Sequence, residues 1–176
     1  DGKWTWWHEN GEVKSERNYR EGVEVGEGGS IITRYDNDLK KVEENFKDGV
    51  RNGKSTSWFE TSQIKSEGNY KDGNRDGKST HWYENGQKSE EKNWKNGNLD
   101  GKWTFWNENG QIKSEGNYIE GNFVSETKYS YYENGQKKEE NNYINDEKDG
   151  KVTEWFKSGQ KKKEVNTKDD KLDGKS

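Results

Sequence analysis

The chain has no cysteine, proline, methionine or alanine among its 176 residues. Without cysteine it forms no disulfide and carries no thiol chemistry, an absence that is compatible with either redox compartment. Hydrophobic residues make up only 23% of the chain and charged residues 38%, whereas globular domains are usually about 45 to 50% apolar. An ordinary layered core is therefore not expected.

Long apolar runs and an excess of one charge are also missing. No run approaches the roughly 20 apolar residues that a membrane helix needs, so membrane insertion is not expected. The 31 basic and 35 acidic residues nearly cancel and are interspersed, so no extended positive field attracts nucleic acid. Because the chain begins with Asp1 instead of Met, we interpret it as a fragment or a processed product.

Aromatic residues are what the chain has in abundance. It contains 9 Trp, 9 Tyr and 5 Phe, which outnumber its valines, isoleucines and leucines. Low hydropathy with many charges is typical of disordered chains, but those chains are poor in aromatic residues. We therefore expect a folded protein whose buried side chains are mostly aromatic.

A repeat of about 24 residues organises the whole chain, which we interpret as one continuous array over residues 1–176. Its opening positions are Gly2, Gly26, Gly53, Gly77, Gly101, Ser125 and Gly150, with a partial module from Gly174. Two aromatic columns follow from this phase. The first lies five residues after the opening position and comprises Trp7, Trp58, Trp82, Trp106 and Trp155, with Tyr131 in a shifted sixth module. The second lies seventeen residues after it at Tyr19, Tyr70, Trp94 and Tyr118, and it includes Phe46 and Tyr143 in the two modules of longer spacing.

Within a module, residues alternate with period two and are punctuated by Gly, Asn and Asp, which predicts strand, turn, strand, turn. Residues 102–106 form one expected strand and residues 111–118 the return strand, with Asn109 and Gly110 in the hairpin turn as in a primed turn. No apolar stripe with helical spacing occurs. The sequence thus predicts an all-β fold: one antiparallel meander of about seven hairpin repeats, with about fourteen strands.

The hairpin register decides which side chains share a face. A two-residue loop pairs Trp106 with Lys113 and puts Tyr118 on the other face, with Trp103 and Phe105. A three-residue loop with Gly110 in a left-handed bulge instead gathers both columns, including Trp106, Ile112 and Tyr118, on one face. We favour the second because the other face, with Lys113, Glu115 and Asn117, then suits water, as is usual for antiparallel sheets.

These spacings resemble a known repeat. Trp94, Gly97 and Gly101 in WKNGNLDGK, an aromatic with glycines three and seven residues later, are similar to the MORN repeat, as are Tyr70-Gly73-Gly77 and Tyr19-Gly22-Gly26. The string DGKWTFWNENGQIKSEGNY more closely resembles the bacterial MORN variant of YwqK-family proteins, which carry an antitoxin label. The usual second glycine is replaced by Trp4, Ser55, Ser79, Trp103 or Val152. The resemblance implies an elongated twisted meander that serves as a scaffold or interaction module.

Catalytic, metal and cofactor sites are not indicated. The two histidines, His8 and His81, occupy different module positions and are too far apart to share a metal. Asp72, Asn74, Asp76 and Gly77 imitate the start of a calcium loop, but Tyr83 stands where the bidentate Glu is required. An inter-module turn explains these residues better. No base is set beside a nucleophile, so we predict a protein that is not an enzyme and has no cofactor.

Exposed aromatic side chains are the best binding candidates. Such rings stack on sugars and attract choline by cation–π interaction, so cell-wall carbohydrate or choline binding is one hypothesis. We interpret the two columns as the core, because the sheet has little else to bury. Trp4, Trp6, Trp103 and Phe105 do not recur in every module and alternate to the other face, so we predict them as binding residues.

The two ends of the array carry a further hypothesis. No capping module is visible, since the chain opens with DGKWTWW in the phase of DGKWTFW and closes with DGKS. Either residues 1–176 are a window of a longer array, or the edge strands are satisfied by further copies, residues 3–7 of one chain pairing with the last strand of the next. We predict a structural or protein-binding scaffold, self-assembling end to end or holding a partner protein such as a toxin.

Overall fold

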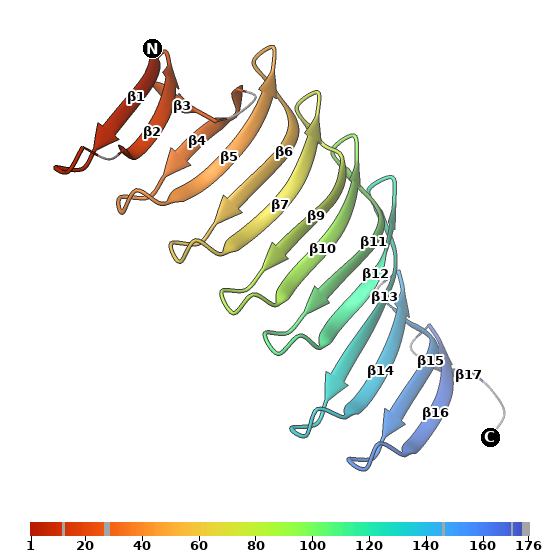
Figure 1. Cartoon of the computed structure of the whole chain (residues 1–176). Helices are drawn as coiled ribbons and strands as arrows, with labels where there is room; N and C mark the ends of the chain where they lie inside the picture. Colours follow the sequence, from red (N-terminus) through yellow and green to blue (C-terminus); the bar gives the residue numbers. More distant parts are fainter. Residues whose placement is uncertain (12, 27–28, 146, 170, 174–176) are drawn as a thin grey trace. The chain divides into compact units, whose positions relative to one another are not determined.

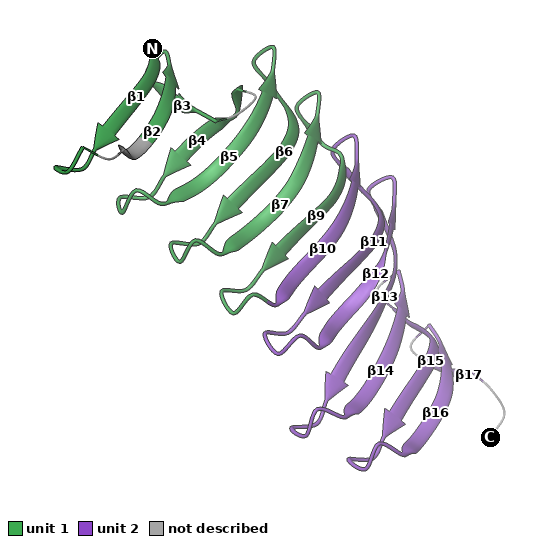
Figure 2. Ribbon diagram, in the orientation of Figure 1, with its two compact units in different colours: residues 1–86 green, residues 87–176 purple. Residues whose placement is uncertain are grey.

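A computed structural model describes residues 1–11, 13–26, 29–145, 147–169 and 171–173. The chain divides into two compact units, Asp1–Gly86 and Gln87–Ser176 (Figure 2). All regular elements in the described residues are β-strands, which confirms the all-β prediction. A single continuous array over both units stays a prediction, and the partial module from Gly174 lies outside the described residues.

Unit 1 is an antiparallel meander in which strands consecutive along the chain pair with one another (Figure 1). Its strands are β1 (Gly2–Trp7), β2 (Val13–Arg20), β3 (Val23–Val25), β4 (Ile31–Arg34), β5 (Lys40–Lys47), β6 (Val50–Trp58), β7 (Ile64–Lys71), β8 (Asn74–Arg75) and β9 (Gly77–Trp82). Both β8 and β9 pair with β7, so they are two pieces of one strand that is interrupted at Asp76.

Unit 2 is a second meander of the same kind. Its strands are β10 (Lys88–Lys95), β11 (Asn98–Trp106), β12 (Ile112–Ile119), β13 (Asn122–Tyr131), β14 (Lys137–Ile144), β15 (Glu147–Trp155), β16 (Lys161–Lys168) and β17 (Lys171–Asp173). The described residues thus form 17 strands, more than expected, because β8/β9 is one interrupted strand, β3 and β4 are two short strands that pair with each other, and β17 is a short addition. They include no helix that could cross a membrane.

The hairpin loop between β11 and β12 has the three-residue geometry. The Asn107 amide donates to the carbonyl of Gln111 (2.8 Å) and the Gly110 amide donates to the carbonyl of Asn107 (2.9 Å). Gly110 has a φ of 80°, a left-handed conformation that glycine adopts without a side-chain clash. Asn109 is not left-handed, so this turn is not the primed turn that the sequence predicted.

A β-bulge beside this loop reverses the faces. The register reads Trp106 with Ile112 and then Phe105 with Ser114, so Lys113 is an extra residue in β12. The pairing of Trp106 with Ile112 confirms the favoured loop length. The extra residue, however, turns the rest of β12 over, so that Tyr118 lies on the side of Trp103 and not of Trp106. The prediction that both aromatic columns share a face is therefore wrong.

The same bulge recurs along the chain, and a lysine is the extra residue each time that a register shows it. These lysines are Lys14, Lys41 and Lys65 in unit 1 and Lys113, Lys138 and Lys162 in unit 2. In the hairpins with this bulge, the two predicted columns therefore lie on opposite faces.

The primed turns lie at the other end of the hairpins, between modules. Glu120 and Gly121, which join β12 to β13, both have positive φ, 48° and 84°. Their two-residue loop closes the pair Ile119 and Asn122, as a type I′ turn does. Asp72 and Gly73 form the same turn, with φ of 49° and 84°, which confirms the turn interpretation of the calcium-loop-like string.

The sixth module is out of phase by one residue. In the fifth module, Gly101 lies opposite Tyr118. The equivalent place opposite Tyr143 is taken by Glu126, one residue after Ser125, which the sequence predicted as the opening position. From Glu126 the column residue Tyr131 has the usual spacing of five, so the apparent shift of this module lies before its opening position.

Candidate functional site

The two sides of each sheet carry different side chains. We call face A the side that carries Trp4, Trp6 and Tyr19 in unit 1 and Trp103, Phe105 and Tyr118 in unit 2, and face B the opposite side. Because side chains alternate along a strand, the first predicted column lies on face B, as Trp7 and Trp106 do. The second column, which contains Tyr19 and Tyr118, lies on face A.

Face B is a polar surface over a row of buried threonines. Thr56 and Thr80 in unit 1 and Thr104 and Thr153 in unit 2 are buried at the same repeat position. Beside Thr104, the Lys102 ammonium bridges to Glu115 at 2.5 Å, and the Tyr129 hydroxyl donates to the same carboxylate at 2.9 Å. Burial raises the pKa of Glu115, but the hydrogen bonds from Lys102 and Tyr129 outweigh it and hold that pKa below its usual value.

Lysines cover the first aromatic column on face B. Lys88 Nζ lies 5.7 Å from the centre of the Trp106 ring and 2.8 Å from Glu91 Oε2, so an ion pair positions the cation over the ring. The arrangement recurs with the lysine, glutamate and tryptophan sets Lys40, Glu43 and Trp58, and Lys137, Glu140 and Trp155. Trp7, in the first hairpin, is 61% exposed.

Face A of unit 2 carries an aromatic cluster whose tryptophan is buried. Trp103 is only 5% exposed, and its ring centre lies 5.1 Å from that of Phe105 and 6.4 Å from that of Tyr118. Lys92 comes from the neighbouring strand β10 and lies over the Phe105 ring at 5.0 Å. A hollow of about 410 Å³ remains, lined by Lys92, Leu99, Trp103, Phe105, Tyr118, Phe123 and Glu126.

Trp103 is buried because a glycine stands opposite it. Trp103 pairs with Gly116 in β12, and a Cβ at Gly116 would lie only 2.8 Å from Cζ2 of the indole. The indole therefore lies against the backbone, where any side chain would displace it. The other neighbour of Trp103 is Lys92 in β10, so the cluster is enclosed by strands on both sides.

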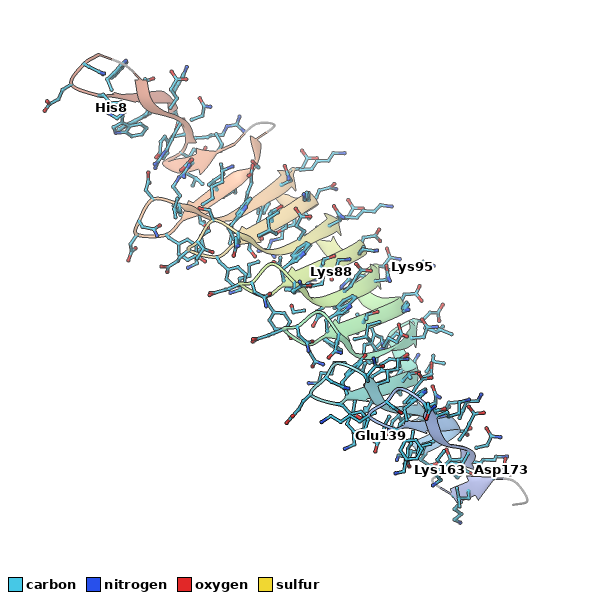
Figure 3. The ribbon with its side chains drawn as sticks, turned by 60° about the horizontal axis from the view of Figure 1, so that its bottom comes forward. His8, Lys88, Lys95, Glu139, Lys163 and Asp173 are labelled. Atoms are coloured by element: carbon cyan, nitrogen blue, oxygen red, sulfur yellow. The ribbon has the colours of Figure 1, made fainter. Side chains whose placement is uncertain are left out.

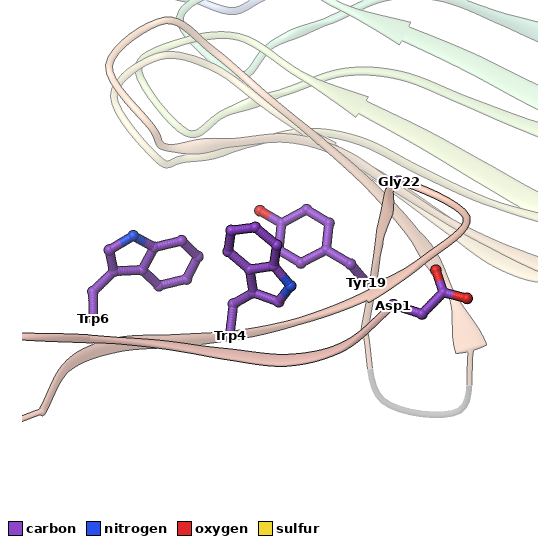
Figure 4. A pocket seen from close by; sticks show the side chains of 5 residues that line it. All are labelled: Asp1, Trp4, Trp6, Tyr19 and Gly22. Atoms are coloured by element: carbon purple, nitrogen blue, oxygen red, sulfur yellow. The ribbon is translucent and has the colours of Figure 1, made fainter.

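Face A of unit 1 carries an open copy of this cluster. Gly2–Trp7 reads GKWTWW where residues 101–106 read GKWTFW, so Trp4, Trp6 and Tyr19 correspond to Trp103, Phe105 and Tyr118. The Trp4 ring centre lies 6.3 Å from that of Trp6 and 5.7 Å from that of Tyr19. Together with Asp1 and Gly22 these rings line a hollow of about 320 Å³ (Figure 4).

Two differences keep the copy in unit 1 open. Trp4 pairs with Arg17 instead of a glycine, and the Arg17 guanidinium lies over the Trp6 ring at 5.3 Å. β1 pairs with β2 on one side, and in Figure 1 its other side has no neighbouring strand within unit 1. As a result Trp4 is 57% exposed, and its ring faces solvent where that of Trp103 is covered.

A charged network fixes Arg17 in place. Arg17 donates to the Asp38 carboxylate, and Arg34 makes a bidentate pair with Glu24, with distances of 2.6 and 2.5 Å. Hydrogen bonding to Glu24 raises the pKa of Arg34 despite its partial burial. The network neutralises the guanidinium beside the Trp4 cluster, and its residues belong to β2, β3, β4 and the loop after β4.

The predicted binding residues therefore divide into two pairs. Trp4 and Trp6 line the hollow of unit 1, where Trp4 is exposed, whereas Trp103 and Phe105 line the hollow of unit 2, where Trp103 is buried. Sequence reasoning missed the residues that complete each cluster, chiefly Tyr19, Asp1, Lys92, Leu99 and Phe123. The shared GKWT string was a signal for the two copies, but the bulge that brings Tyr19 and Tyr118 to the same face was not visible in it.

The histidines lie apart from these clusters. His8 is exposed just after β1 (Figure 3) and His81 is half-buried in β9. Among the described residues, no three His, Cys, Asp or Glu side chains are grouped as a metal site requires.

A comparison with models of protein families finds the same repeat along the chain. The model of the MORN repeat variant matches residues 1–21, 51–72, 75–96, 99–120, 127–145 and 148–169, and these segments cover well over half of the chain. The unmatched stretch holds β3–β5, with Arg34 at the first-column position. A search of curated proteins gives no match. Repeats of this kind indicate a scaffold or binding role, and the chain belongs to the MORN repeat variant family.

Proposed function

We propose that the chain is a non-enzymatic scaffold that binds a protein partner through strand β1 and the aromatic hollow beside it. The observation that carries this proposal is the contrast between Trp4, which is 57% exposed, and Trp103, which is 5% exposed, at the same repeat position. Clustered aromatic side chains are typical interface anchors, and a partner that pairs with a strand beside them adds main-chain hydrogen bonds.

The cluster around Trp103 indicates what the cluster around Trp4 accepts. In it, strand β10 supplies Lys92 directly opposite the indole, and the start of β11, just after the turn, supplies Leu99. A partner strand paired with β1 in the same register supplies an equivalent side chain opposite Trp4 and an apolar one in the hollow. Trp4 and Trp6 are then binding residues, and Trp103 and Phe105 serve the fold. A toxin protein, as the antitoxin label implies, is one partner of this type.

An organic cation is a second candidate ligand, because three aromatic rings and the Asp1 carboxylate line one hollow. Such a set attracts quaternary ammonium groups by cation–π interaction. Choline and short cell-wall oligosaccharides are the probes for this alternative. If choline or an oligosaccharide binds saturably and Trp4→Ala abolishes that binding, the hollow is a small-molecule site and not a protein site.

A strand-bearing peptide tests the proposed function directly. A labelled synthetic peptide with the sequence of residues 88–100, which fills the cluster around Trp103, is titrated with the chain and followed by fluorescence anisotropy. We expect saturable binding that Trp4→Ala weakens and Trp155→Ala, on face B of unit 2, leaves unchanged. The same peptide with Glu at the places of Lys92 and Leu99 is the matched control. Equal binding of both peptides would contradict the proposed function.

A further inference from the structure

The aromatic hollow on face A of unit 2 is separate from the surface that the proposed partner strand contacts. Its volume of about 410 Å³ falls in the range of small-molecule sites, about 300 to 1,000 Å³. Trp103 at its base is buried, whereas Phe105, Tyr118 and Phe123 are half-buried. The buried indole serves the fold, but the rings beside it keep surface that a ligand can contact.

The rings that line this hollow stand at steep angles to one another. The plane of Trp103 is tilted by 57° to that of Phe105 and by 53° to that of Tyr118. The planes of Tyr118 and Phe123 meet at 76°. Rings in one plane offer a flat track to a long chain, whereas tilted rings form the walls of a recess. The hollow therefore suits a compact group about the size of a single ring.

Two ion pairs flank the hollow, each through one residue that lines it. Lys92 Nζ lies 3.1 Å from Glu90 Oε1. Glu126 Oε2 lies 3.1 Å from Lys128 Nζ. Each pair is neutral, so a charged ligand competes with a partner that is already bound. Each pair also has spare hydrogen-bonding capacity, because an ammonium carries three donors and a carboxylate has about four lone-pair sites. A neutral ligand rich in hydroxyl groups uses this capacity and leaves both ion pairs intact.

We propose that the hollow of unit 2 binds one uncharged sugar ring of the glucose type. Such a ring has apolar C–H faces and carries hydroxyl groups around its edge, and each hydroxyl both donates and accepts hydrogen bonds. The C–H faces pack among Phe105, Tyr118 and Phe123. The edge hydroxyls accept from the Lys92 ammonium and donate to the Glu126 carboxylate. Apolar walls with a few polar groups that fix the orientation are the usual composition of a small-molecule site.

The other hairpins of unit 2 do not offer this combination. At the repeat positions of Trp103 and Phe105, hairpin β15–β16 has Val152 and Glu154. Hairpin β13–β14 has Lys128 at the position of Trp103. We therefore expect one sugar site in unit 2, at the hairpin β11–β12. The proposal does not rest on the proposed function, because the residues that carry it belong to β10–β13 and not to β1.

The test is a titration of the ¹⁵N-labelled full chain with methyl β-D-glucopyranoside, followed by ¹H–¹⁵N correlation spectra. Each of the 9 tryptophans gives one indole N–H signal, which is identified by its loss in the corresponding phenylalanine variant. We expect the Trp103 signal to shift saturably, with a dissociation constant on the order of 1 mM. The signals of Trp106 and Trp155, on face B, should stay in place. Sorbitol, which has hydroxyl groups but no ring, is the control probe and should cause no saturable shift.

Two substitutions outside the buried position locate the sugar. Phe123→Ala removes one wall of the hollow, and Glu126→Gln removes the charge that strengthens a hydrogen bond from a hydroxyl. Each should weaken sugar binding by about three- to tenfold, and far-ultraviolet circular dichroism shows whether the variant keeps the fold. Trp4→Ala is the matched control, because Trp4 has the repeat position of Trp103 but lies in unit 1, and it should leave the affinity unchanged.

The outcomes are distinct from those of the peptide titration. A Trp103 signal that does not shift, or that shifts equally with sorbitol, overturns the sugar site. Weaker binding in Trp4→Ala but not in Phe123→Ala or Glu126→Gln places the sugar in unit 1 and also overturns it. Saturable choline binding that shifts the Trp103 signal, with no response to the glucoside, overturns the assignment of a neutral ligand. Binding of the 88–100 peptide decides the proposed function alone, so either idea can fail without the other.

Discussion

Replacing Trp103 and Trp4 by alanine compares one repeat position in two environments. A tryptophan side chain buries about 150 to 250 Å² when covered, and at about 25 cal/mol per Å² full burial contributes about 4 to 6 kcal/mol as an upper bound. Trp103 is 5% exposed and Trp4 57%. We therefore expect Trp103→Ala to cost about 3 to 5 kcal/mol and Trp4→Ala about 2 kcal/mol or less.

The assay is urea unfolding followed by far-ultraviolet circular dichroism, because several other tryptophans obscure the fluorescence change. Repeat arrays can unfold in stages. We therefore compare, between each variant and the unchanged chain, the midpoint of the transition that the substitution shifts, at a concentration where the chain is monomeric. Trp106→Ala, on the lysine-covered face B, is the third variant and should cost less than Trp103→Ala. Equal midpoints for Trp103→Ala and Trp4→Ala, or a larger loss for Trp106→Ala, would refute this assignment of the faces.

Three further predictions concern backbone and charge. Gly116→Ala should lower the unfolding free energy by about 1 to 3 kcal/mol or more, because its Cβ meets the backbone carbonyl oxygen of Ser125 and then the Trp103 indole, whereas Gly68→Ala, with 3.5 Å to the nearest atom, should cost less than half as much in the same urea assay. Ser62 has a φ of 67° at a loop position where most other hairpins have glycine and one has Asp38, so Ser62→Gly should stabilise the chain by about 0.5 to 1 kcal/mol and raise its thermal midpoint; a lower midpoint contradicts this. Because folding depresses the pKa of Glu115, its stabilisation is complete above about pH 4.3 and is lost as the pH falls through the folded pKa. Glu115→Gln should flatten that acid limb in a pH series of urea midpoints, and an unchanged slope argues against it.

The sequence was sufficient to predict the strands and the position of the hairpin turn at Gly110, but not the turns between modules. Period-two alternation and the asparagine–glycine pairs placed the strands and the hairpin turns, because these depend on local residues. The three-residue loop at Gly110 was favoured for another reason, that it puts both aromatic columns on one face, and that reason is wrong. The primed turns were assigned to the wrong end of the hairpin. The structure has them between modules, where Glu120 and Asp72 adopt positive φ, a conformation that is uncommon for residues other than glycine.

The distribution of side chains over the two faces could not be predicted from neighbouring residues in the sequence. A single extra residue such as Lys113 inverts the face of all residues after it, and its presence depends on pairing with the partner strand. For the same reason the burial of Trp103 was missed, since it requires Gly116 across the sheet. The difference between Trp4 and Trp103 depends on a neighbouring strand and on Arg17, and neither is visible in the shared GKWT string.

The strict succession of hairpins has a consequence for how the chain folds. Pairing in the described registers joins strands that follow one another along the chain, apart from the interrupted strand β8/β9, and the loops between them are mostly short. Such local topology has low contact order, so little chain entropy is lost before the first favourable contacts form. The hairpin β11–β12, with Trp103 closed against Gly116, is the natural nucleus, from which folding spreads to neighbouring hairpins one at a time.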